Sequence, residues 1–242
     1  MIPCLKSRAL AVTLAFSTSI TAASAEMTPL FDGRSLDGWE VRSGSGTYKV
    51  EAGVIVGTTT EGSLNTFLCT KRTYGDFVLE FEVQCDPRLN SGVQFRSEAY
   101  GKDVEIEIAG KKTKHAAGRV FGYQVEIAAN GNAGRVYDEA RRATWVDTGK
   151  APGDETPAES ARATAAARTA YQVDGWNRFR VIAQGDHIQT FINGIKITDF
   201  RDRLTAQGFI GLQVHRIKPG EGPFSVKWRN LRIRELRAGE VP

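Results

Sequence analysis

Cysteine and histidine are scarce in this sequence. Its 242 residues include three cysteines and three histidines, with no Cys-x-x-Cys pair and no zinc-type spacing. Cys4 lies in a leader segment, which leaves Cys69 and Cys85. These two flank the turn at 73–76 at unequal distances, so they are out of register and a disulfide is the less favoured alternative. The sequence therefore indicates neither a zinc site nor a disulfide framework.

Nucleotide-binding and nucleophile-elbow motifs are also absent. No P-loop, dinucleotide fingerprint or Gly-x-Ser-x-Gly elbow is found. The formal net charge is only +4, and two of the positive charges, Lys6 and Arg8, lie in the leader. So small an excess argues against a nucleic-acid partner. No run after residue 25 is long and apolar enough to cross a bilayer, which takes about 20 residues. We therefore expect no membrane partner for the mature chain.

The first 25 residues have the three parts of a secretory signal peptide. Lys6 and Arg8 form a charged start, 9–20 is apolar or small, and Ala23-Ser24-Ala25 is an A-x-A cleavage site. The sequence therefore predicts a signal peptide over 1–25 and a mature chain over 26–242. The mature chain should be periplasmic or secreted.

Residues 26–242 consist mostly of short segments in which apolar and polar residues alternate, separated by turns. Asn193-Gly194 between two such segments is a strong hairpin signal, because both residues of that turn need positive φ. Many short strands with regular turns indicate an all-β fold, a jelly-roll sandwich of two antiparallel sheets in one domain. The predicted strand regions are 47–58, 65–85, 91–100, 103–110, 121–131, 176–200, 208–215 and 224–236.

One segment, near 153–170, differs because it is rich in alanine. Thr156 could cap a helix, Pro157 suits the first helical position, and Glu159 completes a capping box. We interpret it as a surface insertion, either a short helix or a mobile lid. A plain exposed loop remains an equal alternative.

Two predicted strands carry polar residues on one face. Gln94 and Arg96 alternate with apolar residues in the first strand, and Gln124 and Glu126 do so in the second. If these faces meet on the concave side of one sheet, they form a lining suited to sugar hydroxyls. Alternation alone favours the other interpretation, in which all four are solvated. Asn90-Ser91-Gly92 opens the first strand and supports the site only weakly, since a turn explains it equally well.

Three further side chains are candidates on position alone. Tyr137 and Asp138 could reach a cleft mouth, although their charged surroundings are also typical of a solvated loop. His215 lies at a strand end, where such clefts gather polar residues. His115 and His187 are expected in exposed positions.

The ordered set of motifs resembles one known family. The stretches "PLFDGRSLDGWE", "YGDFVLEFEV", "NSGVQFRSE", "GYQVEI", the hairpins that begin at Trp176 and "GFIGLQVH" follow one another over 30–233. In this order they are similar to the 3-keto-disaccharide hydrolase family, earlier described as a domain of unknown function. The resemblance implies a concanavalin-A-like jelly roll, in agreement with the strand pattern.

What the resemblance implies is cleavage of glycosides already oxidised at C3 of the sugar. The 3-keto group acidifies the C2 proton, so a base can remove it and expel the C1 aglycone, after which water adds. The implied catalytic residues are Glu126, His215 and Arg96, with Glu126 or His215 as the base and Arg96 beside the enolate oxygen. The resemblance implies Asn90 and Gln124 as substrate-binding residues, and Gln94, Tyr137, Asp138 and Gln213 are further candidates for that role.

No cofactor is certain from the sequence, although a divalent metal held by Glu126 and His215 could share the role of Arg96. The enzyme would act downstream of a sugar 3-dehydrogenase. Two alternatives stay open: a non-catalytic carbohydrate-binding domain, and a conventional glycoside hydrolase, for which the sequence names no second carboxylate.

Overall fold

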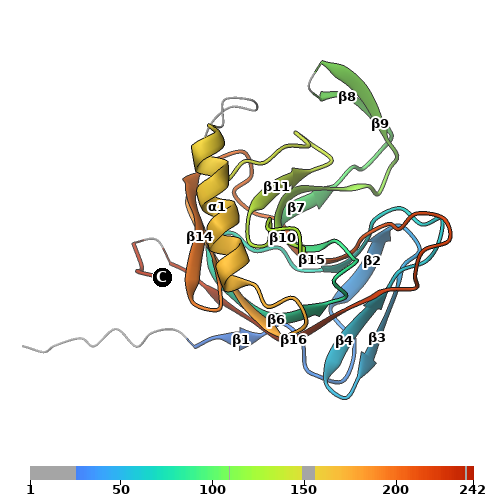
Figure 1. Ribbon diagram of the computed structural model, residues 1–242, viewed down its shortest axis with the longest axis horizontal. Helices are drawn as coiled ribbons and strands as arrows, with labels where there is room; N and C mark the ends of the chain where they lie inside the picture. Colours follow the sequence, from blue (N-terminus) through green and yellow to red (C-terminus); the bar gives the residue numbers. More distant parts are fainter. Residues whose placement is uncertain (1–25, 109, 149–155, 238) are drawn as a thin grey trace, which may run out of the picture.

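The computed structural model describes residues 26–108, 110–148, 156–237 and 239–242. The predicted signal peptide and the start of the alanine-rich insertion, 153–155, lie outside these ranges. Two antiparallel sheets pack face to face, and a two-stranded hairpin projects from one end (Figure 1). Nowhere in the described ranges is there a helix of the length and apolarity needed to cross a membrane.

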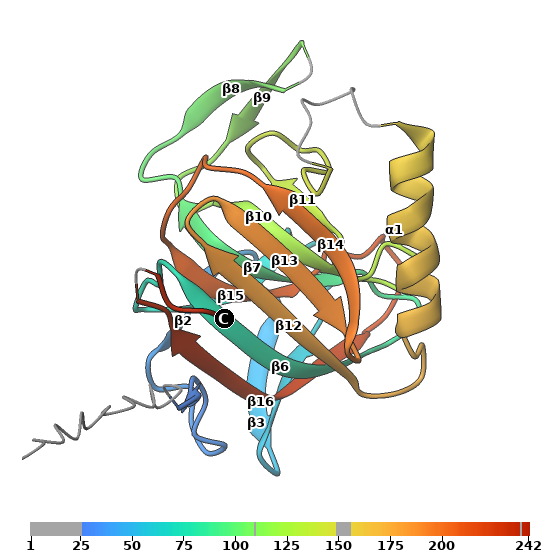
Figure 2. The ribbon, with the colours of Figure 1, turned by 90° about the vertical axis from the view of Figure 1, so that its left-hand side faces the viewer.

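The larger sheet has eight strands and faces the viewer in Figure 2. Its order is β14-β13-β12-β6-β16-β4-β3, with β1 paired to β16. The strands are β1 (Thr28–Pro29), β3 (Thr47–Glu51), β4 (Val54–Thr58), β6 (Phe77–Cys85), β12 (Asn177–Gln184), β13 (His187–Ile192), β14 (Ile195–Arg201) and β16 (Ser225–Glu235).

The smaller sheet has six strands in the order β11-β10-β7-β15-β5-β2. These are β2 (Trp39–Ser43), β5 (Thr66–Thr70), β7 (Ser91–Ala99), β10 (Val120–Ile127), β11 (Val136–Glu139) and β15 (Phe209–Val214). The projecting hairpin consists of β8 (Val104–Ile108) and β9 (Lys111–His115).

The main core lies between the two sheets, because each strand turns its apolar residues inward with a period of two. Phe81 and Phe179 of the larger sheet stack with ring centroids 5.2 Å apart. Phe95 and Tyr123 of the smaller sheet stack at 5.5 Å. All four are at most 1% exposed. The all-β sandwich of antiparallel sheets predicted from the sequence is therefore confirmed.

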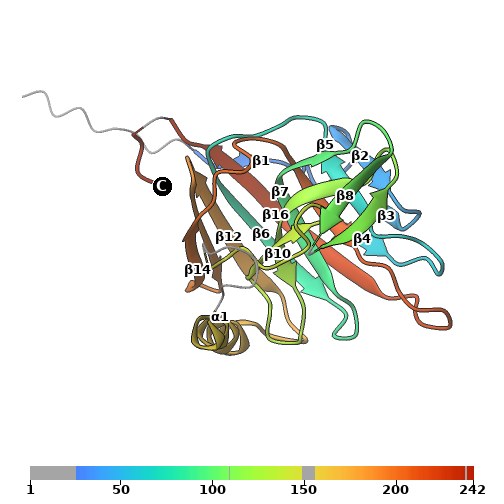
Figure 3. The ribbon, with the colours of Figure 1, turned by 90° about the horizontal axis from the view of Figure 1, so that it is seen from above.

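The alanine-rich segment contains the helix α1 (Pro157–Ala170). Thr156 is its N-cap, and the Thr156 and Glu159 side chains form the predicted capping box. Ala167 and Ala170 are buried where the helix packs beside β14 (Figure 3). Of the alternatives left open by the sequence, a helix is therefore correct for this part of the insertion.

Cys69 and Cys85 are free and buried. The chain leaves the smaller sheet after β5 and enters the larger sheet at β6, so the turn between them is not a hairpin. The disfavoured disulfide is accordingly not formed.

His115 differs from its expected place in an exposed loop. It ends β9 and stacks on Tyr100, with ring centroids 5.5 Å apart and planes 11° from parallel. The β8–β9 hairpin therefore carries a half-buried aromatic side chain to the smaller sheet.

Candidate active site

The outer face of the smaller sheet, which is turned away from the core, carries a row of buried polar side chains. Tyr123 and Val125 of β10 point into the core, so Gln124 and Glu126 point outward. Gln94 lies directly opposite Gln124 on β7. Gln94, Gln124 and Glu126 are 0%, 2% and 6% exposed. These three side chains are thus packed on a covered face, and the solvated alternative is wrong for them.

Glu126 is the end point of a hydrogen-bonded relay. Ser97 Oγ lies 2.7 Å from Gln94 Oε1, and Gln94 Nε2 donates to Gln124 Oε1 at 2.9 Å. Gln124 Nε2 donates to Glu126 Oε2 at 3.0 Å, and Asn90 Nδ2 donates to Glu126 Oε1. The hydrogen bonds therefore fix the orientation of the side-chain amides, and the NH₂ groups of Asn90 and Gln124 both donate to the Glu126 carboxylate.

Gly92 gives the relay its space. A Cβ atom there would lie 2.5 Å from Cγ and Cδ of Gln124. The Gln124 side chain therefore crosses over a position that must be glycine. The triplet 90–92 has no residue with positive φ, so its importance lies in the Asn90 side chain and in this close approach, not in a special turn.

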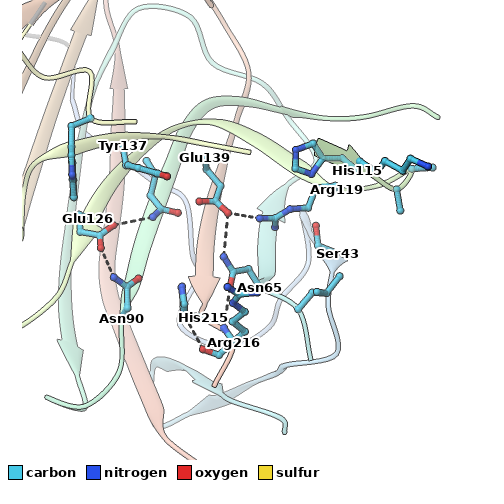
Figure 4. Close-up of a pocket in the computed structure, with 16 residues that line it drawn as sticks. Ser43, Asn65, Asn90, His115, Arg119, Glu126, Tyr137, Glu139, His215 and Arg216 are labelled. Atoms are coloured by element: carbon cyan, nitrogen blue, oxygen red, sulfur yellow. Dashed lines mark hydrogen bonds and ion pairs between the residues drawn. The ribbon is translucent and has the colours of Figure 1, made fainter. Parts of the chain in front are cut away.

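A pocket of about 590 Å³ opens above Glu126, between the sheet and the end of the β8–β9 hairpin (Figure 4). It is lined by polar, basic and aromatic side chains together with a few small ones. The lining residues are Ser43, Leu64, Asn65, Asn90, Lys114, His115, Ala116, Ala117, Arg119, Gln124, Glu126, Tyr137, Glu139, Trp145, His215 and Arg216. The size and mixed lining suit a small polar ligand.

The pKa of Glu126 is raised from 4.5 to about 7. Burial is the main cause, because it disfavours the charged form, and the Glu139 carboxylate adds repulsion. The amides of Asn90 and Gln124 oppose the shift by bonding the charged form. Glu126 can therefore both accept and return a proton near neutral pH.

This shift predicts a pH dependence of folding stability. The folded protein binds the Glu126 proton more tightly than the unfolded chain, so the free energy of unfolding should fall as pH rises from 4.5 to about 7. The loss should be about 3 kcal/mol. Urea unfolding at several pH values should show this slope in the wild type and a flatter one in Glu126→Gln. Parallel curves for the two proteins would contradict the assignment.

Glu139 supplies a second carboxylate on the same face. It lies on β11 opposite Gly122, bonds to Arg119 Nη2, and accepts from Asn65 Nδ2 at 3.1 Å. Sequence reasoning selected Tyr137 and Asp138 in this strand, but a period of two places Tyr137 and Glu139 together and Asp138 on the opposite face. Glu139 could thus have been found from alternation. Asn65 and Arg119 lie just outside strands and gave no such signal.

His215 lies at the end of β15 and lines the pocket. Its Nδ1 atom is 2.7 Å from the Arg216 carbonyl oxygen, which can only accept, so Nδ1 carries the hydrogen and Nε2 has the lone pair. Asn65 Oδ1 accepts from the Arg216 backbone at 3.0 Å and so fixes this turn. Burial lowers the pKa of His215, which keeps it a neutral proton acceptor at pH 7.

Arg96 does not share the face of Glu126, so that prediction is wrong. Its guanidinium is buried toward the larger sheet, donating to Gly75 O at 2.8 Å, Gly185 O at 2.7 Å and Asp76 Oδ1 at 2.8 Å. The cause is a β-bulge in β7, where Arg96 has φ of 44° and the register with both neighbouring strands shifts. The extra residue reverses the alternation, so Arg96 cannot reach the pocket.

The remaining predicted residues divide between the pocket and the core. Tyr137 lines the pocket and packs edge-on against Trp145 at 5.3 Å. Asp138 points to the opposite face, is 0% exposed, and pairs with Arg141 and Arg142. Its proposed contact with substrate is therefore wrong. Gln213 is fully buried, on the same face as His215.

Glu126 and His215, the metal ligands considered from the sequence, do not belong to a cluster of metal-binding side chains in the described residues. Within the described ranges, no group of three or more His, Cys, Asp or Glu side chains is arranged to hold a metal ion. Glu126 and His215 therefore lack a third ligand of these types, and no step below runs through a metal.

The two packed antiparallel sheets form a β-sandwich of the jelly-roll type. Several solved structures share this fold. A carbohydrate-binding module of family 66 from Bacillus subtilis is 16% identical, with a TM-score of 0.51 over 82% of this chain and 96% of that one. A protein with a galectin-like fold from Bacillus subtilis has a TM-score of 0.54 at 11% identity, over 84% and 92% of the two chains. A candidate glycosyl hydrolase from Parabacteroides distasonis has a TM-score of 0.51 at 16% identity, over 87% and 94%.

The chain belongs to the family of 3-keto-alpha-glucoside-1,2-lyase-like domains, whose model matches residues 26–234. The family resemblance and the jelly-roll fold predicted from the sequence are thus confirmed. No match to the sequence is found among curated proteins.

Proposed function

We propose that this protein cleaves 3-keto-glycosides by removing the C2 proton, with Glu126 as the base. The observation that carries the proposal is a carboxylate in the floor of a polar pocket, 6% exposed, with a pKa of about 7. Membership of the 3-keto-alpha-glucoside-1,2-lyase-like family supports the substrate class. A C2 proton next to a ketone is acidic enough for such a base, whereas the same proton of an unoxidised sugar is not.

The proposed reaction takes two stages. Glu126 takes the proton from C2, and the electron pair of that bond passes to the C3 oxygen as an enolate. The electron pair returns as C1=C2 forms and the C1–O bond breaks, which releases the aglycone. Glu126 passes the proton from C2 to the departing aglycone oxygen. Water then adds its hydroxyl to C1 and, through Glu126, its proton to C2. The net result is hydrolysis.

The other pocket residues have supporting roles in this proposal. Asn90 and Gln124 bond Glu126 itself, so they act by positioning the base more than by holding sugar hydroxyls as first expected. His215 offers Nε2 as an acceptor for a sugar hydroxyl or as a second base. Tyr137 and Trp145 offer aromatic surface for the sugar ring.

A conventional hydrolase is the second candidate, because Glu139 supplies the second carboxylate that the sequence left unnamed. Glu139 is bonded by Arg119 and Asn65, which suits a fixed anion better than a nucleophile or an acid. A non-catalytic binding domain would tolerate loss of Glu126 without loss of function.

The experiment that separates these functions compares release of the same aglycone from an unoxidised glucoside and from its 3-keto form. Purified protein is incubated with a chromogenic glucoside, with and without prior oxidation at C3 by a sugar 3-dehydrogenase. We expect aglycone release only from the oxidised form. Equal release from both would indicate a conventional hydrolase, and release from neither, with sugar binding retained, a binding domain.

Export of the protein is also part of the proposal. The leader at 1–25 predicts a mature chain that starts near Glu26 in the periplasm or outside the cell. Intact-mass measurement of protein from the native host should give the mass of 26–242. A mass that still includes Met1 would contradict export by this route.

A further inference from the structure

One aromatic side chain of the pocket, Trp145, projects from the edge of the smaller sheet. The chain turns back after β11, and residues 144–147 run antiparallel to it. The Val146 backbone N–H donates to the Val136 carbonyl at 3.0 Å, and Trp145 forms a bridge with Tyr137. Opposite residues in an antiparallel pair share a face, so Trp145 and Tyr137 project from the same outer face. The Trp145 side chain is half-buried and lines the pocket, so a bound molecule can contact it.

The indole ring of Trp145 is held in place before any ligand binds. The Arg135 guanidinium lies over the ring, 4.6 Å from its centroid, and the Tyr137 ring meets it edge-on at 5.3 Å. Both carboxylate oxygens of Asp147 accept from Arg135, at 2.8 and 3.0 Å, and Arg135 Nη1 donates to Ser160 Oγ of α1 at 3.0 Å. Little conformational entropy is therefore lost when a second ring packs on the indole.

This ring lies next to the proposed base. The backbone of residues 134 and 135 is opposite Glu126: the Glu126 N–H donates to the Arg135 carbonyl at 2.9 Å, and the Gly134 N–H donates to the Glu126 carbonyl at 2.8 Å. Because the Arg135 side chain packs against the indole, Trp145 covers the position that adjoins Glu126 on the β11 side. Aromatic surface thus borders the base on that side.

The direction of the reacting bonds follows from the chemistry of the sugar. C1 and C3 are the two ring neighbours of C2, so the aglycone and the ketone leave C2 in different directions. A base at the C2 proton therefore has the ketone on one side and the leaving group on the other. The negative charge that develops on the C3 oxygen favours the side on which cations lie. The cations that line the pocket among the described residues are Lys114, Arg119 and Arg216.

These cations lie away from the indole. Arg216 comes soon after β15, and β15 and β11 are on opposite sides of β10 in the sheet. The guanidinium of Arg119 lies over the Phe67 ring of β5, which is the next strand beyond β15. Arg135 is on the β11 side, but it is 2% exposed and ion-paired. The charges of the pocket therefore direct the ketone toward β15 and the aglycone toward Trp145.

We propose that Trp145 is the platform for the aglycone: a ring carried by the leaving group packs flat on the indole while Glu126 removes the C2 proton. The inference rests on the proposed function and assigns the aromatic surface to the leaving group. An aromatic ring or a pyranose has a flat face for stacking, whereas a short alkyl group has none. The protein should therefore select 3-keto-glycosides by the shape of the aglycone.

The test compares a benzyl and an ethyl 3-keto-glucoside. Both release a primary alcohol, so the chemistry at C1 is similar, and the ratio of their kcat/KM values measures contact with the ring. We expect a ratio of about ten for the wild type, benzyl over ethyl. Trp145→Leu should lower the ratio to about one, because leucine keeps apolar bulk and loses the flat face. Trp145→Phe keeps a flat ring and should keep most of the ratio.

Trp176→Leu is the matched control. Trp176 is also half-buried, but it packs against the Arg229 guanidinium at 4.0 Å and does not line the pocket. Its ratio should equal that of the wild type. Because each ratio is measured within one preparation, it does not depend on the fraction of the variant that is folded.

A glucose aglycone linked through its C6 oxygen also leaves as a primary alcohol, and it repeats the comparison for a sugar ring. A fall of the ratio in Trp145→Leu for either ring supports the platform and identifies the ring that it takes. An equal fall of kcat/KM on the ring and ethyl substrates would place the cleaved sugar on the indole and would overturn the proposal. A wild-type ratio of about one for both rings would also overturn it. If the wild type cleaves none of these substrates, the proposed function fails instead.

Discussion

Replacing Glu126 with glutamine should lower kcat on a 3-keto-glucoside by a factor of about 10²–10⁴ and change KM little. Glutamine keeps the shape of the side chain and removes the proton acceptor. Since proton removal occurs only in the transition state, the loss should fall on kcat. Steady-state kinetics with a chromogenic 3-keto-glucoside would measure both constants.

Glu107→Gln is the matched control, because Glu107 is exposed on β8 and does not line the pocket. Its kcat should equal that of the wild type. If Glu126→Gln keeps near wild-type turnover, the base lies elsewhere, and His215→Ala would then decide whether Nε2 of His215 is that base. Near wild-type turnover in both variants would end the proposed mechanism.

Arg96→Ala should destabilise the protein by about 3 kcal/mol while each folded molecule keeps its wild-type kcat. The guanidinium is 1% exposed and donates to two backbone carbonyls and to Asp76. Its removal takes a donor from the Gly75 and Gly185 carbonyls, leaves Asp76 only the backbone N–H of Gly185, and opens a cavity in the core. Urea unfolding would give the loss of stability, and kinetics below the transition would give kcat.

Arg88→Ala is a suitable control, because Arg88 is exposed and its ion pair with Asp86 is at the surface. Such exposed pairs contribute little to stability, so Arg88→Ala should unfold at nearly the wild-type urea concentration. A large fall in kcat for Arg96→Ala at unchanged stability would contradict the structural role and would restore Arg96 to the site.

Period-two alternation predicted most of the strands and placed Gln124 and Glu126 on one face of β10, because alternation is a local property of the chain. It did not predict that this face is buried, since alternation alone favoured solvated side chains. The hairpins of 177–201 were placed correctly by Asn193-Gly194 and Gly185, all with positive φ. The same rule failed at Arg96, because a bulge adds one residue and reverses the faces beyond it. Nothing in the sequence around Arg96 marks that insertion.

The pocket itself could be predicted only in part. Glu126, Gln124 and His215 lie on strands whose alternation or end is visible in the sequence, and Glu139 follows from Tyr137 by the same rule. Asn65 and Arg119 lie just outside strands and reach the pocket through contacts made by distant parts of the chain. Such long-range contacts depend on sheet order, which single-sequence patterns do not determine.

The order of the elements explains why one end of the smaller sheet becomes the site. The loop before β5 brings Asn65, the end of β9 brings His115, and the residue just after β15 is His215 (Figure 4). Together they enclose the polar face of β7 and β10. Burial of Glu126 by this enclosure is the physical source of its raised pKa.

Solvent deuterium in the product tests the central claim, removal of the C2 proton, most directly. A 3-keto-glucoside is cleaved in D₂O, the reaction is stopped early, and the released sugar is analysed by mass spectrometry and NMR. The product incubated alone with enzyme for the same time corrects for later exchange. We predict one deuterium at C2 in nearly every released sugar. Cleavage that leaves the original hydrogen at C2 would contradict the account.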